Sequence, residues 1–321
     1  MIKYQKWEIM IKRKEINMGF EILKFIIYSI LIVIIAKYVL VKLLRKLAEG
    51  LNLSPKAVGN IAGIATSVPE LLTVSFSAFA GLLGTSIYNI LSSNIINTVQ
   101  YIFSIFLNKN QKVMKNKAIQ IDLIMVAFTI IIPAGMLIWH IDFTIIMVPI
   151  FLFLFFLFYY INGNAHKLYL KKQDEQMDNE IVEESKYVKG KSNLIIRYSF
   201  YLLITSVALY IIGNQLSVVL ENLAQIFFIP EFALGIALGF ITSLPELITF
   251  FEAQKHYKKE EKQELGVVEA TNNLLTSNIL NLFIIQSIGI IIFYAVGNPP
   301  RQEEMLLAMK QIQIKIQSLK N

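Results

Sequence analysis

The chain of 321 residues contains no cysteine and only three scattered histidines. Disulfides, thiolate metal sites and thiol nucleophiles are therefore excluded, and the histidines are too few and too far apart for a usual zinc site. Charge is also scarce, because Asp, Glu, Lys and Arg make up 17% of the residues against about 25% in soluble domains. Hydrophobic residues reach 55% and the mean hydropathy is +0.56. This balance predicts an integral membrane protein without a second, soluble domain.

Long apolar runs recur along the whole chain. A helix of about 20 apolar residues crosses a bilayer, and eight runs meet this requirement: 19–44, 53–80, 82–107, 118–139, 143–161, 194–219, 227–251 and 264–296. The last run is longer than a bilayer needs, so we expect it to bend or to begin outside the membrane. No short hydrophobic segment with a cleavage site follows the basic start, so we expect a retained helix there. The fold class is all-α and multi-pass, in a membrane that the sequence leaves unspecified.

Basic residues separate the two sides of the membrane. Nineteen Lys and Arg lie in the loops 42–56, 109–117, 165–197 and 255–262, whereas the connections near 81, 140–142 and 220–226 contain none. Cytoplasmic loops carry such an excess, so the basic loops are predicted to be cytoplasmic and both termini to lie outside. The formal net charge of +7 therefore marks topology, and we expect no nucleic-acid partner.

Two short segments occur twice in the chain. Residues 66–71 (T-S-V-P-E-L) recur as 242–247 (T-S-L-P-E-L), and residues 89–97 (N-I-L-S-S-N-I-I-N) recur as 273–281 (N-L-L-T-S-N-I-L-N). Five spans separate the copies in each pair, so the copies cross the membrane in opposite directions. This predicts inverted repeats with broken helices and a substrate site near the membrane midplane, as in many secondary transporters.

The polar segments then divide the chain. The expected parts are a basic N-terminal tail (1–18), a first membrane repeat (19–164), a charged cytoplasmic linker (165–193), a second membrane repeat (194–297) and a polar tail (298–321). The pattern of the tail fits an interfacial amphipathic helix and a frayed polar end equally well.

The repeated motifs carry an unusual set of oxygen atoms. Glu70 and Glu246 lie within apolar runs far from any Lys or Arg, and a carboxylate in a membrane is costly unless a positive charge compensates it. Each follows a proline, Pro69 or Pro245, which breaks the helix and frees a carbonyl one turn earlier. The other donors are Thr66, Ser67, Ser93, Asn97, Thr242, Ser243, Ser277 and Asn281. Two carboxylates in an all-oxygen set suit a hard cation such as Ca²⁺ rather than a transition metal.

Other polar and aromatic residues have simpler interpretations. Asn94 and Asn278 are either further site residues or bridges between helices. The aromatic run 151–160 is expected to face lipid. Solvation at the interface is expected for the titratable residues near span ends, which are Asp122, His140, Asp142, Glu221 and Glu231.

At the paired motifs the sequence resembles the cation/calcium exchanger superfamily, and within it the sodium/calcium exchanger type, whose inverted alpha repeats read approximately G-T-S-x-P-E and G-S-N-x-x-N/D. The resemblance covers nearly the whole chain, and the T-S-x-P-E form differs from the G-N-x-x-E of proton-coupled calcium exchangers. It implies that Glu70 and Glu246 are central ligands used by both Ca²⁺ and Na⁺. It also implies that the hydroxyls and amides named above complete the site, that carbonyls near Gly63 and Gly239 can join it, and that spans 1 and 6 slide against spans 2, 3, 7 and 8.

The chain departs from this family pattern in several places. Asn281 stands where some relatives have aspartate, which leaves two carboxylates. Glu246 and Asn281 are 35 residues apart, against 27 for Glu70 and Asn97. Only eight of the family's ten spans are recognised, so the second repeat looks truncated. Four motif glycines are replaced, which predicts looser helix packing; the replacements are Ala65, Ser92, Ile241 and Thr276.

The sequence therefore predicts a secondary antiporter that exchanges Ca²⁺ for Na⁺ in a lipid bilayer, with these ions as substrates and no cofactor. No nucleophile with a base and no aspartate pair is visible, so an enzyme is not expected. Two alternatives stay open: a K⁺-dependent, Mg²⁺-coupled or H⁺-coupled exchanger, and a truncated homologue that binds cations without transport. Protein partners are not indicated.

Overall fold

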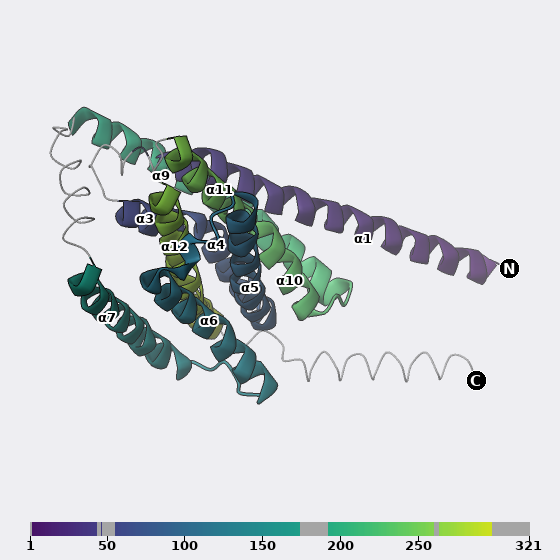
Figure 1. Cartoon of the computed structure of the whole chain (residues 1–321). Helices are drawn as coiled ribbons and strands as arrows, with labels where there is room; N and C mark the ends of the chain where they lie inside the picture. The colour runs from purple at the N-terminus through teal and green to yellow at the C-terminus, as the bar shows by residue number, and fades with distance from the viewer. Residues whose placement is uncertain (1, 44–45, 47–54, 174–191, 260–262, 297–321) are drawn as a thin grey trace.

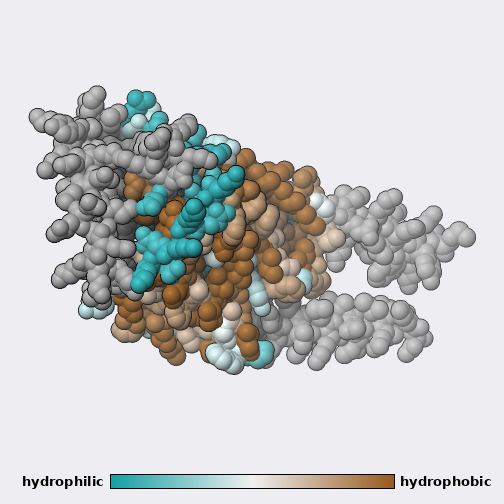
Figure 2. Space-filling model, viewed as in Figure 1, coloured by the Kyte–Doolittle hydropathy of each residue, from teal (hydrophilic) through white to brown (hydrophobic). Residues whose placement is uncertain are grey.

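The computed structural model describes residues 2–43, 46, 55–173, 192–259 and 263–296, in which the regular elements are all helices. In this described part of the chain, seven helices are long and apolar enough to cross a membrane, and Met147–Asn162 forms a shorter apolar helix. These eight helical stretches correspond to the eight predicted runs. The chain is therefore a multi-pass integral membrane protein, and Figure 2 shows hydrophobic residues over most of its visible described surface.

The helices follow one another in two groups. The first group is α1 (Ile2–Ile35), η1 (Ala36–Val41), α3 (Pro55–Thr66), α4 (Val68–Phe79), α5 (Leu83–Leu107), η2 (Val113–Lys115), α6 (Lys117–Ile138) and α7 (Met147–Gln173). The second is α9 (Ser192–Glu221), η3 (Asn222–Ile226), α10 (Glu231–Thr242), α11 (Leu244–Lys259), α12 (Gln263–Ile279), η4 (Leu280–Ile285) and α13 (Gln286–Ala295). The basic segment 1–18 is helical from Ile2 onward, and α7 extends into the predicted linker. The rest of that linker up to residue 191 and the tail 298–321 lie outside the described residues.

Spans 2 and 7 break at the repeated motif. Helix α3 ends at Thr66 and α4 begins at Val68, while α10 ends at Thr242 and α11 begins at Leu244. The prolines next to these breaks have no N–H to continue the helical ladder. The same interruption in both halves is the broken-helix, inverted-repeat fold that the duplicated sequence predicts. The long last run is one helical stretch in which the π-helical η4 joins α12 to α13.

Each broken helix packs on a helix of the other repeat, α3 on α12 and α10 on α5 (Figure 1). Glycines at the contact bring the backbones together, as in small-residue packing of membrane helices. A Cβ on Gly63 would lie 2.7 Å from the Asn273 carbonyl oxygen, and a Cβ on Gly235 would lie 2.7 Å from that of Thr85. The expected looser packing is therefore not found, because Gly63 and its counterpart Gly239 provide the close approach that the replaced glycines do not.

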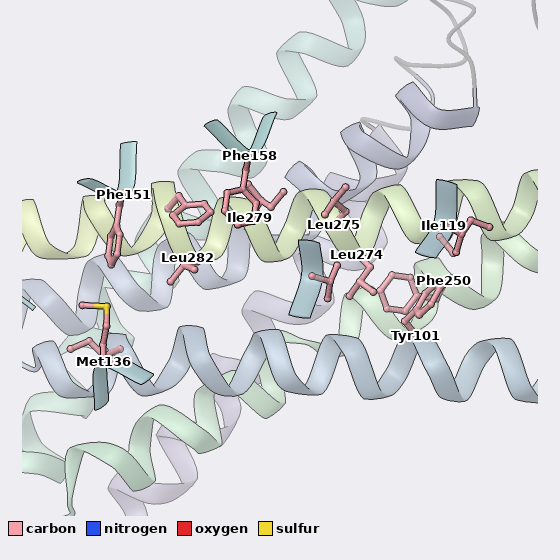
Figure 3. Packing of buried hydrophobic residues seen from close by; sticks show 14 of the residues in the cluster. Tyr101, Ile119, Met136, Phe151, Phe158, Phe250, Leu274, Leu275, Ile279 and Leu282 are labelled. Atoms are coloured by element: carbon pink, nitrogen blue, oxygen red, sulfur yellow. The ribbon is translucent and has the colours of Figure 1, made fainter. Parts of the chain in front are cut away.

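Apolar side chains between α5, α6, α7, α12 and η4 form the largest core cluster (Figure 3). Phe151 and Phe158 of α7 are buried in it, with ring centroids 6.1 and 5.2 Å from Phe283. The prediction that the whole run 151–160 faces lipid was therefore wrong, because one face of α7 packs on η4. Tyr159 and Tyr160 are exposed, at 74% and 69%.

Two acidic residues near span ends are less solvated than predicted. Asp122 of α6 is only 2% exposed and lies close enough to the buried Tyr101 to interact with it electrostatically. Glu231 is half-buried at the start of α10, and its Oε2 accepts a hydrogen bond of 3.1 Å from the Thr85 amide in the first turn of α5. Both expectations of interfacial solvation were wrong, because helix packing covers these side chains.

Glu231 acts as an N-cap for α5 from the other repeat. The residue at the start of that helix, Leu82, makes no capping bond with its side chain, and a carboxylate there also interacts well with the helix dipole. We expect Glu231→Ala to lower the free energy of unfolding by about 1 kcal/mol, the typical cost of a lost cap. Thermal unfolding of the purified protein in detergent measures this, with the exposed Glu221→Ala as control. Equal stability of the two variants would contradict the capping role.

Candidate cation site

The two motif glutamates are completely buried. Glu70 and Glu246 are 0% exposed and lie in the first turns of α4 and α11, directly after the helix breaks. Free N–H groups at a helix N-terminus favour negative charge there. Among the described residues, no Lys, Arg or His is found beside either motif carboxylate.

Hydroxyl groups from both repeats face Glu70. They belong to Thr242, at the end of α10, and to Ser93 of α5, whose oxygens lie 3.5 Å apart. Neither carboxylate oxygen of Glu70 has a hydrogen-bond partner among the described residues. Glu246 lies near enough to interact with Glu70 electrostatically.

Glu246 has equivalent surroundings, in which one hydroxyl comes from its own repeat and one from the other repeat. Ser277 of α12 donates a 3.2 Å hydrogen bond to Glu246 Oε1, and Thr66, at the end of α3, also faces the carboxylate. The Ser67 hydroxyl, which has one proton to donate, lies 2.9 Å from Ser277 Oγ and 2.8 Å from the Gly63 carbonyl oxygen. A continuous set of hydroxyl and carbonyl oxygens therefore surrounds the second carboxylate.

The motif asparagines lie one turn further along α5 and the last span. Asn97 donates through Nδ2 to Asn278 Oδ1 at 3.3 Å, and Asn281 donates through Nδ2 to Asn94 Oδ1 at 3.2 Å. The Oδ1 atoms of Asn97 and Asn281 have no partner among the described residues. Asn94 and Asn278 are thus bridges between helices, one of the two interpretations that the sequence left open.

Several buried oxygens of this region accept no hydrogen bond, although buried polar atoms without a partner are rare and costly. In the described part of the chain they are Glu70 Oε1 and Oε2, Glu246 Oε2, Asn97 Oδ1, Asn281 Oδ1 and Ser243 Oγ. The described residues contain no group of three His, Cys, Asp or Glu side chains able to hold a metal ion. The unpartnered carboxylate, amide and hydroxyl oxygens are the donor types that a hard cation prefers.

All ten residues predicted for the site are buried, and contacts with the glutamates are described above for Thr66, Ser93, Thr242 and Ser277. Sequence reasoning missed a second pair of contacts that support the glutamates: Asn89 donates to Thr73 Oγ1 at 2.7 Å, and Asn273 donates to Thr249 Oγ1 at 2.6 Å. Thr249 in turn donates to the main-chain oxygen of Glu246 at 2.9 Å, whereas the Thr73 hydroxyl lies 2.9 Å from the Pro69 carbonyl oxygen and 3.2 Å from that of Glu70. The signal was present in the sequence, because both copies of the first repeated motif continue to a threonine, as T-S-x-P-E-L-x-T.

Comparison with known proteins gives a family and several similar structures. The sequence model of a family described as "Sodium/calcium exchanger protein" matches residues 22–162 and 198–314. No curated protein sequence matches the chain significantly. Among solved structures, the sodium-calcium exchanger NCX_Mj soaked with 10 mM Na⁺ and zero Ca²⁺ is 21% identical, with 90% of this chain and 87% of that one covered and a TM-score of 0.46. The same exchanger soaked with 2.5 mM Na⁺ and 10 mM Sr²⁺ is 22% identical, with the same coverage and a TM-score of 0.45. Because the family match covers most of its length, the chain belongs to the sodium/calcium exchanger protein family.

Proposed function

We propose that this protein is a secondary antiporter that exchanges Ca²⁺ for Na⁺ at one buried site, which the two inverted repeats expose alternately to either side of the membrane. The observation that carries the proposal is the burial of Glu70 and Glu246 with no basic partner among the described residues. Each carboxylate is reached by hydroxyl groups from both repeats. Membership of an exchanger family supports the same conclusion.

The chemistry of the donors supports Ca²⁺ as one substrate. Ca²⁺ takes six to eight oxygen ligands in flexible geometry, and two carboxylates neutralise its charge. Na⁺ uses the same kind of oxygens, so the two ions compete for Glu70 and Glu246. An empty site holds two uncompensated carboxylates inside the membrane, which makes reorientation without an ion costly. Exchange rather than free leakage follows from that cost.

The identity of the coupling ion has a second candidate. Asn281 contributes a neutral amide where some members of the family have a third carboxylate. The negative charge available to balance bound cations is therefore smaller than in those members. This keeps a K⁺-dependent, Mg²⁺-coupled or H⁺-coupled exchange of Ca²⁺ as the alternative to Na⁺ coupling.

Purified protein reconstituted into Na⁺-loaded liposomes tests the proposal. Diluting these vesicles into Na⁺-free buffer with radioactive Ca²⁺ is expected to produce uptake at least tenfold above that of protein-free vesicles. Collapsing the Na⁺ gradient with a sodium ionophore should remove the uptake, since the gradient supplies the driving force.

Matched vesicles loaded with K⁺, Mg²⁺ or acidic buffer identify the coupling ion. Uptake with one of these and none with Na⁺ would replace the proposed coupling by the alternative. No uptake under any gradient, by folded protein that still binds Ca²⁺, would contradict transport and favour a cation-binding homologue.

A further inference from the structure

We propose that Asn94 and Asn278 are positioning residues, which orient the amides of Asn281 and Asn97 so that their oxygens rather than their nitrogens face the cation. This inference rests on the proposed function, because it concerns the same site. All four side chains are 0% exposed. Their hydrogen bonds form two equivalent series, and in each series the residues of one repeat take the place of those of the other.

Each series of hydrogen bonds begins at atoms that act as acceptors in this structure. Asn94 Nδ2 donates to the carbonyl oxygens of Asn278 and Thr129, at 3.2 and 3.3 Å. Asn278 Nδ2 donates to the Asn94 carbonyl at 3.2 Å and to Thr98 Oγ1 at 3.4 Å. The proton of the Thr98 hydroxyl is already given to the Asn94 carbonyl at 2.8 Å, so this hydroxyl accepts from Asn278.

These acceptors determine which way each amide points. A carbonyl has no proton to give, so the NH₂ group of Asn94 or Asn278 must face it, and the hydrogen-bond network is what distinguishes amide oxygen from nitrogen. The Oδ1 atom of Asn94 then faces the other way and accepts from Asn281, and that of Asn278 accepts from Asn97. A rotated amide would bring two NH₂ groups, or two oxygens, into contact.

The last step determines what the cation meets. Because the Nδ2 atoms of Asn97 and Asn281 are bonded to the positioning residues, their Oδ1 atoms remain, buried and without a partner in the described residues. An amide rotated by half a turn would present N–H groups instead, and these repel a cation. Asn94 and Asn278 thus act on ion binding through their neighbours, without contributing a ligand themselves.

A double-mutant cycle on full-length protein in detergent tests the relay, with equilibrium binding of radioactive Ca²⁺ as the readout. We expect Asn94→Leu to lower the affinity for Ca²⁺ about tenfold, and Asn281→Leu to lower it by at least as much. The double variant should bind as weakly as Asn281→Leu alone, because Asn94 acts through Asn281. In the Asn97→Leu background, by contrast, Asn94→Leu should still reduce the affinity about tenfold.

The outcomes separate the proposals. An Asn94→Leu effect of the same size in both backgrounds would show a general structural role and overturn the inference, as would an unchanged affinity. If Asn94→Leu does not fold, the cycle of Asn278→Leu with Asn97→Leu tests the same relay on its other arm. A parent protein that binds neither Ca²⁺ nor Na⁺ would overturn this inference together with the proposed function, whereas a binding parent with additive cycles would overturn the inference alone.

Discussion

Replacing Glu70 or Glu246 by glutamine is expected to abolish Ca²⁺ exchange and, at the same time, to make the cation-free protein more resistant to heat. Both effects have the same origin. The carboxylates are buried without a basic partner among the described residues, so they stabilise a bound cation and destabilise the protein when no cation is bound. Truncating one partner of a buried charge pair costs about 2–5 kcal/mol, which corresponds to a loss of affinity for Ca²⁺ of roughly thirtyfold or more.

Two measurements check this prediction. Ca²⁺ uptake into Na⁺-loaded liposomes should fall to the level of empty vesicles for both variants. Unfolding temperatures in detergent should rise without Ca²⁺ and should no longer increase when Ca²⁺ is added, because a ligand stabilises only the form that binds it. Glu221→Gln, on an exposed side chain, is the matched control and should resemble the parent. Uptake that survives both substitutions would mean that the ion site lies elsewhere.

The second large effect is expected for alanine at the glycines between the repeats. A Cβ on Gly63 would lie 2.7 Å from the Asn273 carbonyl oxygen and 2.9 Å from Thr276 Cβ. Both distances are shorter than the contacts that Cβ atoms make in folded proteins. Helix α3 must then move away from α12, and overpacking of this kind costs about 1–3 kcal/mol. Because the Gly63 carbonyl also accepts the hydroxyl of Ser67, we expect weaker Ca²⁺ binding as well as a lower unfolding temperature for Gly63→Ala.

The chain contains its own control for this experiment. Beyond the backbone of its own helix, Gly19 on α1 has no atom within 4 Å of the place where a Cβ would be. Gly19→Ala should therefore leave Ca²⁺ binding unchanged and raise stability by up to about 1 kcal/mol through helix propensity. Gly235→Ala, on α10, should behave like Gly63→Ala. Parent-like stability of both interface variants would contradict the close packing of the repeats.

The sequence was sufficient for the spans, the inverted repeats and the residues that come together around Glu70 and Glu246. Hydropathy indicates a helix that crosses the membrane, and a duplicated motif indicates two equivalent positions, so neither requires knowledge of contacts. Which face of a helix meets lipid is a different matter, because lipid and protein interior are equally apolar. Phe151 and Phe158 could not be distinguished from Phe153 and Phe156 for this reason, although the first pair is buried and the second exposed.

Contacts between distant segments were also beyond the sequence. Glu231 lies near the end of a span, where water is the usual partner, but its carboxylate meets the amide of Thr85, 146 positions away in the chain. The hydrogen-bond pattern around Asn94 likewise depends on how α5 crosses the last span. Composition identifies these side chains as polar, and only the packing of the helices determines what each one bonds to.

The exchange of helices between the repeats also has a consequence for synthesis. Helix α3 packs on α12, and α10 packs on α5, so these helices find their main packing partners in the other half of the protein. While the ribosome is still producing the second half, Glu70 is already in the membrane, but Thr242, which faces it in the finished protein, has not yet been made. A chain interrupted between the halves therefore lacks the Thr242 hydroxyl that faces Glu70 in the finished protein. The ion site is completed only when translation reaches the last helices.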